Sequence, residues 1–202
     1  MSALTILTCL ILLNIFPAAG FMQEITLGMV FLLILPVLYI RLILKKPLNE
    51  FGFSLRNRKT GFLWGGIMLL ASLIIAFLLI TFTKLKTTYI FPDYIINNFW
   101  LFLAYELIFA NLFLFLNEAF FKGFVLFSFA KKFNYWSIAF SFIVYSVIIT
   151  ATGNFNWQMA PMLILAITGS IVSYKNRSFI YSYLMGLIFL IFFDAYLIYI
   201  LK

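Results

Sequence analysis

Apolar stretches close to twenty residues long recur along this 202-residue chain, and short polar segments separate them. An α-helix rises about 1.5 Å per residue, so a stretch of this length crosses the roughly 30 Å hydrocarbon core of a lipid bilayer. We predict seven such stretches, at residues 4–19, 25–44, 61–83, 98–116, 136–152, 158–174 and 178–201. Hydrophobic residues make up 65% of the chain and charged residues only 10%, a balance that does not suit a water-soluble domain. The sequence therefore predicts an all-α, polytopic transmembrane bundle, with residues 1–202 forming a single domain.

Basic residues are distributed unevenly between the predicted connections. Three lie on one side of the membrane: Lys84, Lys86 and Lys202. Eleven lie on the other: Arg41, Lys45, Lys46, Arg56, Arg58, Lys59, Lys122, Lys131, Lys132, Lys175 and Arg177. Because cytoplasmic loops carry an excess of Lys and Arg, we expect a cytoplasmic N-terminus and an external C-terminus. The location expected for the protein is a bacterial cytoplasmic membrane. The net charge of +8 then reflects topology, and the expected partner is the bilayer and not nucleic acid.

The chain contains no histidine, and its single cysteine, Cys9, lies in the first apolar stretch. Histidine is the commonest general base near neutral pH and the commonest metal ligand. Its absence excludes most zinc hydrolases and every enzyme that pairs Ser or Cys with His. We therefore expect no metal and no cofactor.

The connection at residues 45–60 is the longest one predicted on the cytoplasmic side. Phe51, Phe53 and Leu55 alternate there with small residues, among basic side chains. This pattern is compatible with a segment that lies in the membrane interface and equally with an ordinary polar loop that carries a few apolar residues.

Six carboxylates are candidates for chemistry, because a charge in hydrocarbon costs several kcal/mol (about 3 or more) unless it is paired or neutralised. Three fall in connections and are expected to be solvated: Glu24, Glu50 and Asp93. Glu106 and Asp194 fall near mid-membrane and are expected to be neutral. They either share a proton in a transport pathway or serve as packing contacts, with Asn111 or Tyr105 as hydrogen-bond partners.

Glu118 lies at the predicted cytoplasmic end of the fourth stretch. Lys122 follows one helical turn later, so the simplest interpretation is an interfacial ion pair at i,i+4 spacing. The surrounding run, Asn-Glu-Ala-Phe-Phe-Lys-Gly at residues 117–123, resembles the first signature of the CAAX protease and bacteriocin-processing family of intramembrane proteases. That signature is a pair of glutamates, two variable residues, Phe, Arg and Gly. Glu118, Phe121 and Gly123 match it, whereas Asn117 stands for the first glutamate and Lys122 for the arginine.

The resemblance extends over about residues 48–194. Residues 48–53 are similar to the family's segment upstream of a conserved helix, and residues 173–178 to its short basic turn. The family is thought to activate water with glutamate and histidine. The positions that correspond to its two histidines are Ile149 or Ser146, and Gly186 or Leu190, in the two possible registers of each motif. The resemblance thus implies the family's helical frame without its bases.

Three functions are compatible with these residues. The first is a non-catalytic relative of these proteases that acts as a scaffold, regulator or partner subunit of another membrane protein. The second is a divergent active endopeptidase in which Glu118 is catalytic. The third is a small carrier or channel that uses Glu106 and Asp194. We favour the first, because loss of one member of a cooperating catalytic unit costs nearly as much activity as loss of all.

Overall fold

The computed structural model describes residues 2–18, 20–55, 57–89, 91, 93–151 and 157–201, and these residues form helices and connections without a β-strand. In chain order the elements are α1 (Ser2–Ile15), α2 (Phe21–Gly28), η1 (Met29–Ile34), α3 (Leu35–Leu38), η2 (Tyr39–Ile43), η3 (Leu48–Phe51), α4 (Arg58–Phe82), α5 (Leu85–Thr88), α6 (Asp93–Ile96), α7 (Phe99–Ala104), η4 (Tyr105–Ala110), α8 (Asn111–Asn117), η5 (Glu118–Val125), α9 (Leu126–Phe133), α10 (Trp136–Ala151), η6 (Trp157–Met159), α11 (Ala160–Asn176) and α12 (Ile180–Leu201). The all-helical prediction is confirmed for this part of the chain.

Several of these elements join into helices long and apolar enough to cross a membrane. Five are found among the described residues: Phe21–Ile43, Arg58–Phe82, Phe99–Phe133, Trp157–Asn176 and Ile180–Ile200. Two further apolar helices, Ser2–Ile15 and Trp136–Thr150, are shorter. The chain is thus a multi-pass membrane protein by length and composition, and two of the seven predicted stretches form helices below the usual spanning length.

Local sequence signals account for the helix ends. The side chain of Asn98 accepts hydrogen bonds from the backbone N–H of Trp100 and Leu101, at 3.0 and 3.3 Å, and so caps the start of α7. At the other end of the same continuous helix, Asn134 follows α9 with a positive φ of 50°. Arg177, with φ of 54°, ends α11 in the left-handed region.

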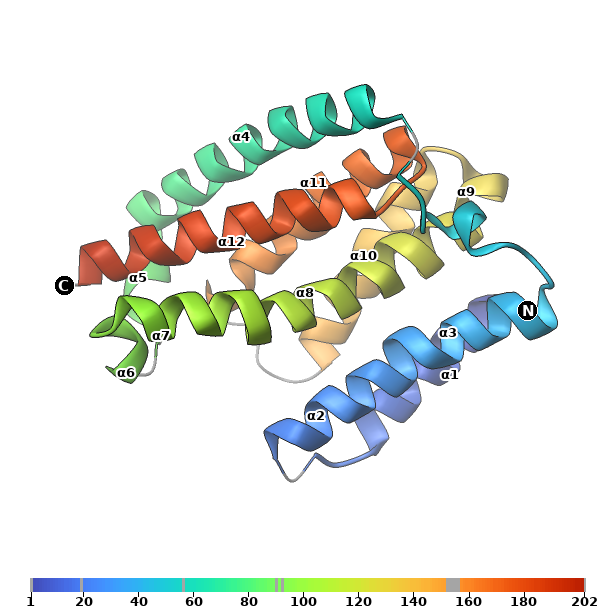
Figure 1. Ribbon diagram of the computed structural model, residues 1–202, viewed down its shortest axis with the longest axis horizontal. Helices are drawn as coiled ribbons and strands as arrows, with labels where there is room; N and C mark the ends of the chain where they lie inside the picture. The colour runs from blue at the N-terminus through green and yellow to red at the C-terminus, as the bar shows by residue number, and fades with distance from the viewer. Residues whose placement is uncertain are drawn as a thin grey trace.

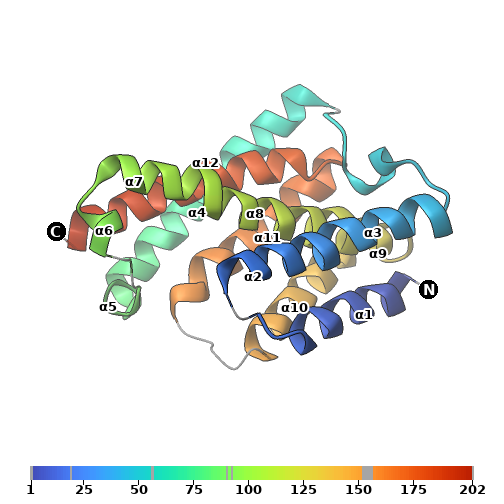
Figure 2. The same cartoon turned by 60° about the horizontal axis from the view of Figure 1, so that its bottom comes forward.

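Consecutive long helices run in alternating directions (Figure 1). The N-terminus, the segment between η2 and α4, the α9–α10 turn and the α11–α12 turn therefore lie at one end of the bundle, and the C-terminus lies at the other. The second view shows the same arrangement, with α1, α2 and α3 packed as a hairpin beside the rest (Figure 2). The connections predicted to share the basic side lie at the same end of the bundle as the N-terminus. Arg56 of that set and Lys202 of the opposite set are outside the described residues.

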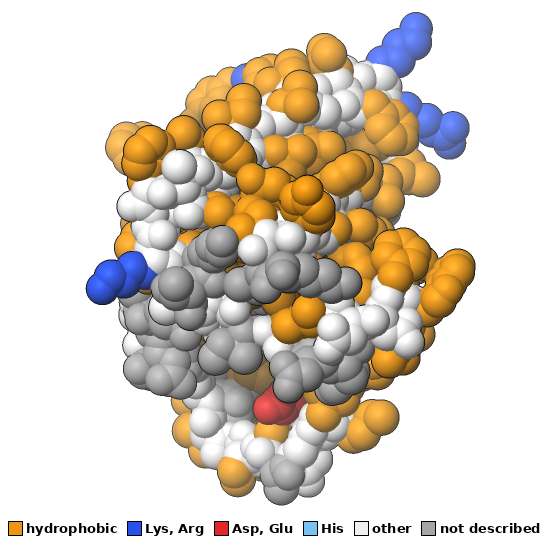
Figure 3. Space-filling view, turned by 90° about the vertical axis from the view of Figure 1, so that its left-hand side faces the viewer, with side chains coloured by type: hydrophobic (Ala, Val, Ile, Leu, Met, Phe, Trp, Pro, Cys, Tyr) orange, Lys and Arg blue, Asp and Glu red, His pale blue; other side chains and the backbone are white. Residues whose placement is uncertain are grey.

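Two apolar clusters form the core. One packs the N-terminal hairpin against η5 and α9, with Ile40, Phe120 and Phe124 at its centre. The other packs α4, α11 and α12 together around Leu165 and Phe189. Large hydrophobic side chains are also exposed along the flanks of the helices, for example Leu70 and Phe77 on α4. Figure 3 shows further hydrophobic side chains at the end of the bundle opposite the N-terminus. An apolar outer surface of this kind suits contact with lipid.

The segment that follows η2 folds back onto the bundle. Phe51 is only 5% exposed, and its ring lies 6.2 Å from that of Phe124. The Phe53 ring meets that of Phe179 edge to face at 4.8 Å, and the Gly52 carbonyl accepts a hydrogen bond from the Phe179 N–H at 3.3 Å. Both interpretations of this segment were therefore incomplete, because its two phenylalanines pack on protein and only Leu55 is exposed.

The fourth predicted stretch, 98–116, was too short. Its helix continues without interruption from Phe99 to Phe133 and includes two π-helical turns, η4 and η5. A π-helical turn changes the direction in which the following side chains point, and such turns are frequent at functional sites. Each of the two lies at a buried glutamate: Glu106 is the second residue of η4 and Glu118 is the first residue of η5.

Candidate functional site

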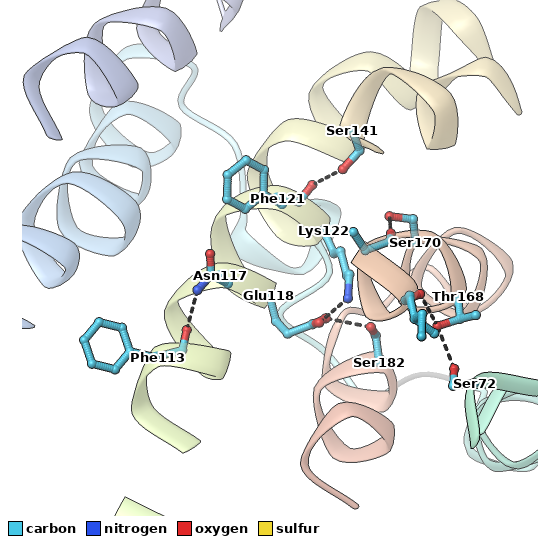
Figure 4. Close-up of polar contacts among 12 residues, drawn as sticks. Ser72, Phe113, Asn117, Glu118, Phe121, Lys122, Ser141, Thr168, Ser170 and Ser182 are labelled. Atoms are coloured by element: carbon cyan, nitrogen blue, oxygen red, sulfur yellow. Dashed lines mark hydrogen bonds and ion pairs between the residues drawn. The ribbon is translucent and has the colours of Figure 1, made fainter. Parts of the chain in front are cut away.

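Glu118 forms the centre of a buried polar cluster. The Lys122 ammonium donates to its Oε1 in an ion pair, and the Ser182 hydroxyl donates to its Oε2 at 2.6 Å (Figure 4). Glu118 is 2% exposed and Lys122 is 4% exposed. The i,i+4 pairing is confirmed, but the prediction of an interfacial pair at the end of a helix was wrong. Lys122 accordingly does not belong with the basic residues of a connection.

Three helices position this cluster. η5 supplies Glu118 and Lys122, and α12 supplies Ser182. α11 passes on the third side with Gly169, where a Cβ would collide with the Lys122 ammonium and the Ser182 hydroxyl. This polar cluster lies at the boundary between the two apolar core clusters. Phe121 belongs to one core cluster and Leu165 to the other, and both line the small cavity beside Glu118.

Buried hydroxyl groups lie around the ion pair, and several of them donate hydrogen bonds to neighbouring protein groups. Ser141 of α10 donates to the Phe121 carbonyl at 2.8 Å (Figure 4). Ser72 of α4 donates to the Thr168 hydroxyl of α11 at 3.0 Å, and Ser170 donates to the Ala166 carbonyl at 2.6 Å. Hydroxyl groups of this kind hold membrane helices together without a net charge.

The other residues of the signature-like run have packing roles. The Asn117 amide donates to the Phe113 carbonyl of its own helix at 2.8 Å. The Phe121 ring packs edge to face on Tyr145 at 4.8 Å. A Cβ at Gly123 would lie 3.2 Å from the Phe51 carbonyl oxygen, so glycine lets the folded-back segment approach η5.

A cavity of about 20 Å³ lies beside Glu118 and Lys122. Its remaining lining comes from Leu114, Asn117, Phe121, Ser141, Tyr145, Met162, Leu165, Ala166 and Ser170. This volume holds about one water molecule. A peptide substrate does not fit in it, and both oxygens of the neighbouring carboxylate already accept hydrogen bonds.

The positions that correspond to the family's histidines carry no base. Ser146 is half-buried on α10, and its hydroxyl has no hydrogen-bond partner among the described residues. Gly186 packs against Leu114, whose methyl groups lie 3.3 Å from where its Cβ would be, and Leu190 is buried in the α4–α11–α12 core. Ile149 lies on α10. A general base with an imidazole ring is therefore absent from this part of the protein.

Glu106 and Asp194 form a second buried cluster, as the sequence suggested they would if their helices touched. Their carboxyl groups lie close enough to interact, and the Tyr89 side chain contacts Asp194. Asn111 does not join them: its amide donates to the Leu107 carbonyl at 3.0 Å and its oxygen accepts from the Tyr183 hydroxyl. Sequence reasoning missed Tyr89, because it lies in a predicted connection and nothing distinguishes it from the other ten tyrosines of the chain.

Neither cluster has the donor set of a metal site. Within residues 2–18, 20–55, 57–89, 91, 93–151 and 157–201, no group of three or more Cys, Asp or Glu side chains is placed to hold a metal ion. Searches of known protein families, of curated proteins and of solved structures found no match to this chain. Function is therefore inferred from the residues and their geometry.

Proposed function

We propose that this chain is a non-catalytic relative of the CAAX-type intramembrane proteases, which acts as a scaffold, regulator or partner subunit of another membrane protein. The observation that carries this proposal is the burial of the Glu118 carboxylate and its engagement in hydrogen bonds. Both of its oxygens accept hydrogen bonds, from Lys122 and from Ser182, in the protein interior. A general base must instead face water beside a bound substrate, whereas Glu118 is 2% exposed and the cavity next to it has room for only about one water molecule.

The arrangement around Glu118 also lacks the other parts of a hydrolytic site. Hydrolysis of a peptide bond requires donors aimed at the developing oxyanion and space for the substrate. The adjacent cavity of about 20 Å³ is too small for a peptide, and two of its polar lining groups, Ser141 and Ser170, already donate to backbone carbonyls. The polar cluster therefore suits a structural role, in which it fixes η5, α11 and α12 relative to one another.

The proposed topology has seven spans, with the two short helices α1 and α10 also crossing and the N-terminus in the cytoplasm of a bacterium. The alternating helix directions and the basic connections at one end support it (Figure 1). A cysteine introduced at Asn154, outside the described residues, should react with an impermeant reagent from outside, and one at Asn57 should not. Both are made in a Cys9→Ala background. The reverse labelling pattern would overturn the orientation.

The alternatives are an active endopeptidase and a small carrier or channel. They assign different roles to Glu118: essential for turnover in the first, and off the transport pathway in the second. The deciding experiment reconstitutes the purified protein in lipid vesicles with prenylated and unmodified membrane peptides. We expect no cleavage product from either the native protein or its Glu118→Gln variant. Cleavage by the native protein that is lost in Glu118→Gln would contradict the non-catalytic assignment.

A partner subunit makes a separate prediction. Gentle solubilisation of native membranes, followed by purification of this chain and mass spectrometry, should recover one other membrane protein in a fixed stoichiometry. Recovery of the chain alone at every detergent concentration would count against a scaffold or subunit role.

A further inference from the structure

Three segments far apart in sequence meet at Glu106. Glu106 lies on η4, Asp194 lies on α12, and Tyr89 follows α5. The Tyr89 ring packs edge to face on Phe193 at 5.7 Å, which places its side chain beside Asp194. Glu106 precedes Glu118 by twelve residues of one helix, so this cluster lies about 18 Å along the helix from the ion pair.

The two carboxyl groups are buried, and no ion pair between described residues includes either of them. Glu106 is 0% exposed and Asp194 is 4% exposed. Among the described residues, no N–H or hydroxyl group donates a hydrogen bond to either oxygen of Glu106 or to Oδ1 of Asp194. The ion pairs between described residues are Glu118–Lys122 and Glu50–Lys131, and neither includes these two acids. An ionised carboxylate in this position would cost several kcal/mol, roughly 3 or more.

We infer that Glu106 and Asp194 together form a proton-binding site, with Tyr89 as a neighbouring hydroxyl group. Two like charges in contact at low dielectric strongly disfavour each other, so the pair is stable when it holds a proton between its oxygens. Unlike a metal ion, a proton needs no coordination shell. A calcium ion requires roughly six to eight oxygen ligands, and the side chains here supply only two carboxyl groups and a phenol hydroxyl.

The site is distinct from the Glu118 cluster in its means of neutralisation. On the same long helix, Glu118 is neutralised by a lysine and Glu106 faces another acid. Among the described residues, Tyr89 interacts with both acids and with Tyr105, and Lys84 lies five residues before Tyr89 in the chain. Loss of the shared proton would place two negative charges across the contact between η4 and α12. The proton therefore holds these two elements together, whether or not the protein has catalytic activity.

The test uses infrared difference spectroscopy of the purified protein in lipid nanodiscs during a pH titration. At neutral pH we expect the carbonyl absorption of a protonated carboxylic acid in the native protein. It should be lost or shifted in both Glu106→Gln and Asp194→Asn. Glu24→Gln, which removes an exposed carboxylate of α2, should leave it unchanged.

A measurement on the native chain keeps the test valid if either variant fails to fold. Isotope-labelled aspartate should shift the part of the absorption that comes from Asp194. The chain has one other aspartate, Asp93, and its contribution is identified with the Asp93→Asn variant. Absence of the protonated absorption at neutral pH would overturn the inference. Its loss on addition of sodium, magnesium or calcium ions at constant pH would also overturn it, because a metal site would then be indicated.

Discussion

Lys122 reaches Glu118 through a space that Gly169 leaves open on the neighbouring helix. A Cβ at position 169 would collide with the Lys122 ammonium and with the Ser182 hydroxyl, and it would lie 2.8 Å from Lys122 Cε. The ammonium cannot move aside without leaving the Glu118 carboxylate in a low-dielectric interior. The close packing of α11 on η5 and the buried ion pair therefore depend on each other.

Gly169→Ala should lower the stability of the folded protein by about 1–3 kcal/mol, the usual cost of overpacking a close-packed interior. Chemical denaturation in detergent micelles measures the change. The matched control is Gly66→Ala on α4, where an added Cβ has nothing within 4 Å. That control should be neutral or slightly stabilising, because alanine favours the helix. Equal stabilities of the two variants would show that the space at Gly169 is not needed.

The ion pair itself should behave as an interior pair. Glu118→Gln should destabilise the protein by about 3–5 kcal/mol, because it leaves the Lys122 ammonium buried without a charge partner. An interfacial pair of the kind predicted from the sequence would change stability by no more than about 2 kcal/mol. The double variant Glu118→Gln/Lys122→Met should be more stable than Glu118→Gln alone. Additive losses in the double variant would contradict an interior pair.

The helices and their order could be predicted from the apolar stretches. A membrane helix makes its backbone hydrogen bonds within itself, so a stretch of sufficient length and hydrophobicity is enough to form one. The extent of the long helix did not follow. Glu118 and Lys122 each count as polar in a hydropathy pattern, yet they neutralise each other and let the helix continue to Phe133. The turns η4 and η5, which aim Glu106 and Glu118 inward, depend on packing between distant segments and leave no local signal.

The candidate sites were predictable only in part. The sequence identified Glu106, Glu118 and Asp194, since acids in apolar stretches are conspicuous. It did not identify Ser182, which is one of many serines. The docking of residues 51–53 was also missed, because contacts with Phe124 and Phe179 join positions more than seventy residues apart in the chain.

Gly52 should be essential for that docking. Its φ is +83°, a left-handed conformation that other residues adopt only with strain, and a Cβ there would lie 3.0 Å from the Phe179 nitrogen. Gly52→Ala should therefore cost about 1–3 kcal/mol and release the segment at residues 45–57. Limited proteolysis should cleave this segment faster than in the native protein. Gly20→Ala, at a position with open space, should leave the cleavage rate unchanged.

The exposed pair of Glu50 and Lys131 should make a small, pH-dependent contribution to the same docking. Lys131 donates to Glu50 Oε2 at 2.7 Å, and this hydrogen bond is the main reason that the pKa of Glu50 lies below its ordinary value. The charges of Lys131 and Lys46 lower this pKa further. A carboxyl whose pKa is lower in the folded state stabilises that state at pH values above its unfolded pKa of about 4.3. The contribution disappears as the pH falls through the lower, folded value.

Replacement of the partner tests this relationship directly. In Lys131→Gln the pKa of Glu50 should rise toward about 4.3, as followed by the NMR shift of its carboxyl carbon during an acid titration. Lys132→Gln, which removes the adjacent charge but not the hydrogen bond, should change the pKa of Glu50 much less. High salt should bring the native value part of the way toward that of Lys131→Gln, since exposed charges are screened. An unchanged titration in Lys131→Gln would mean that the contact with Lys131 does not form in solution, and that the segment is held by Phe51, Phe53 and the Gly52–Phe179 hydrogen bond without it.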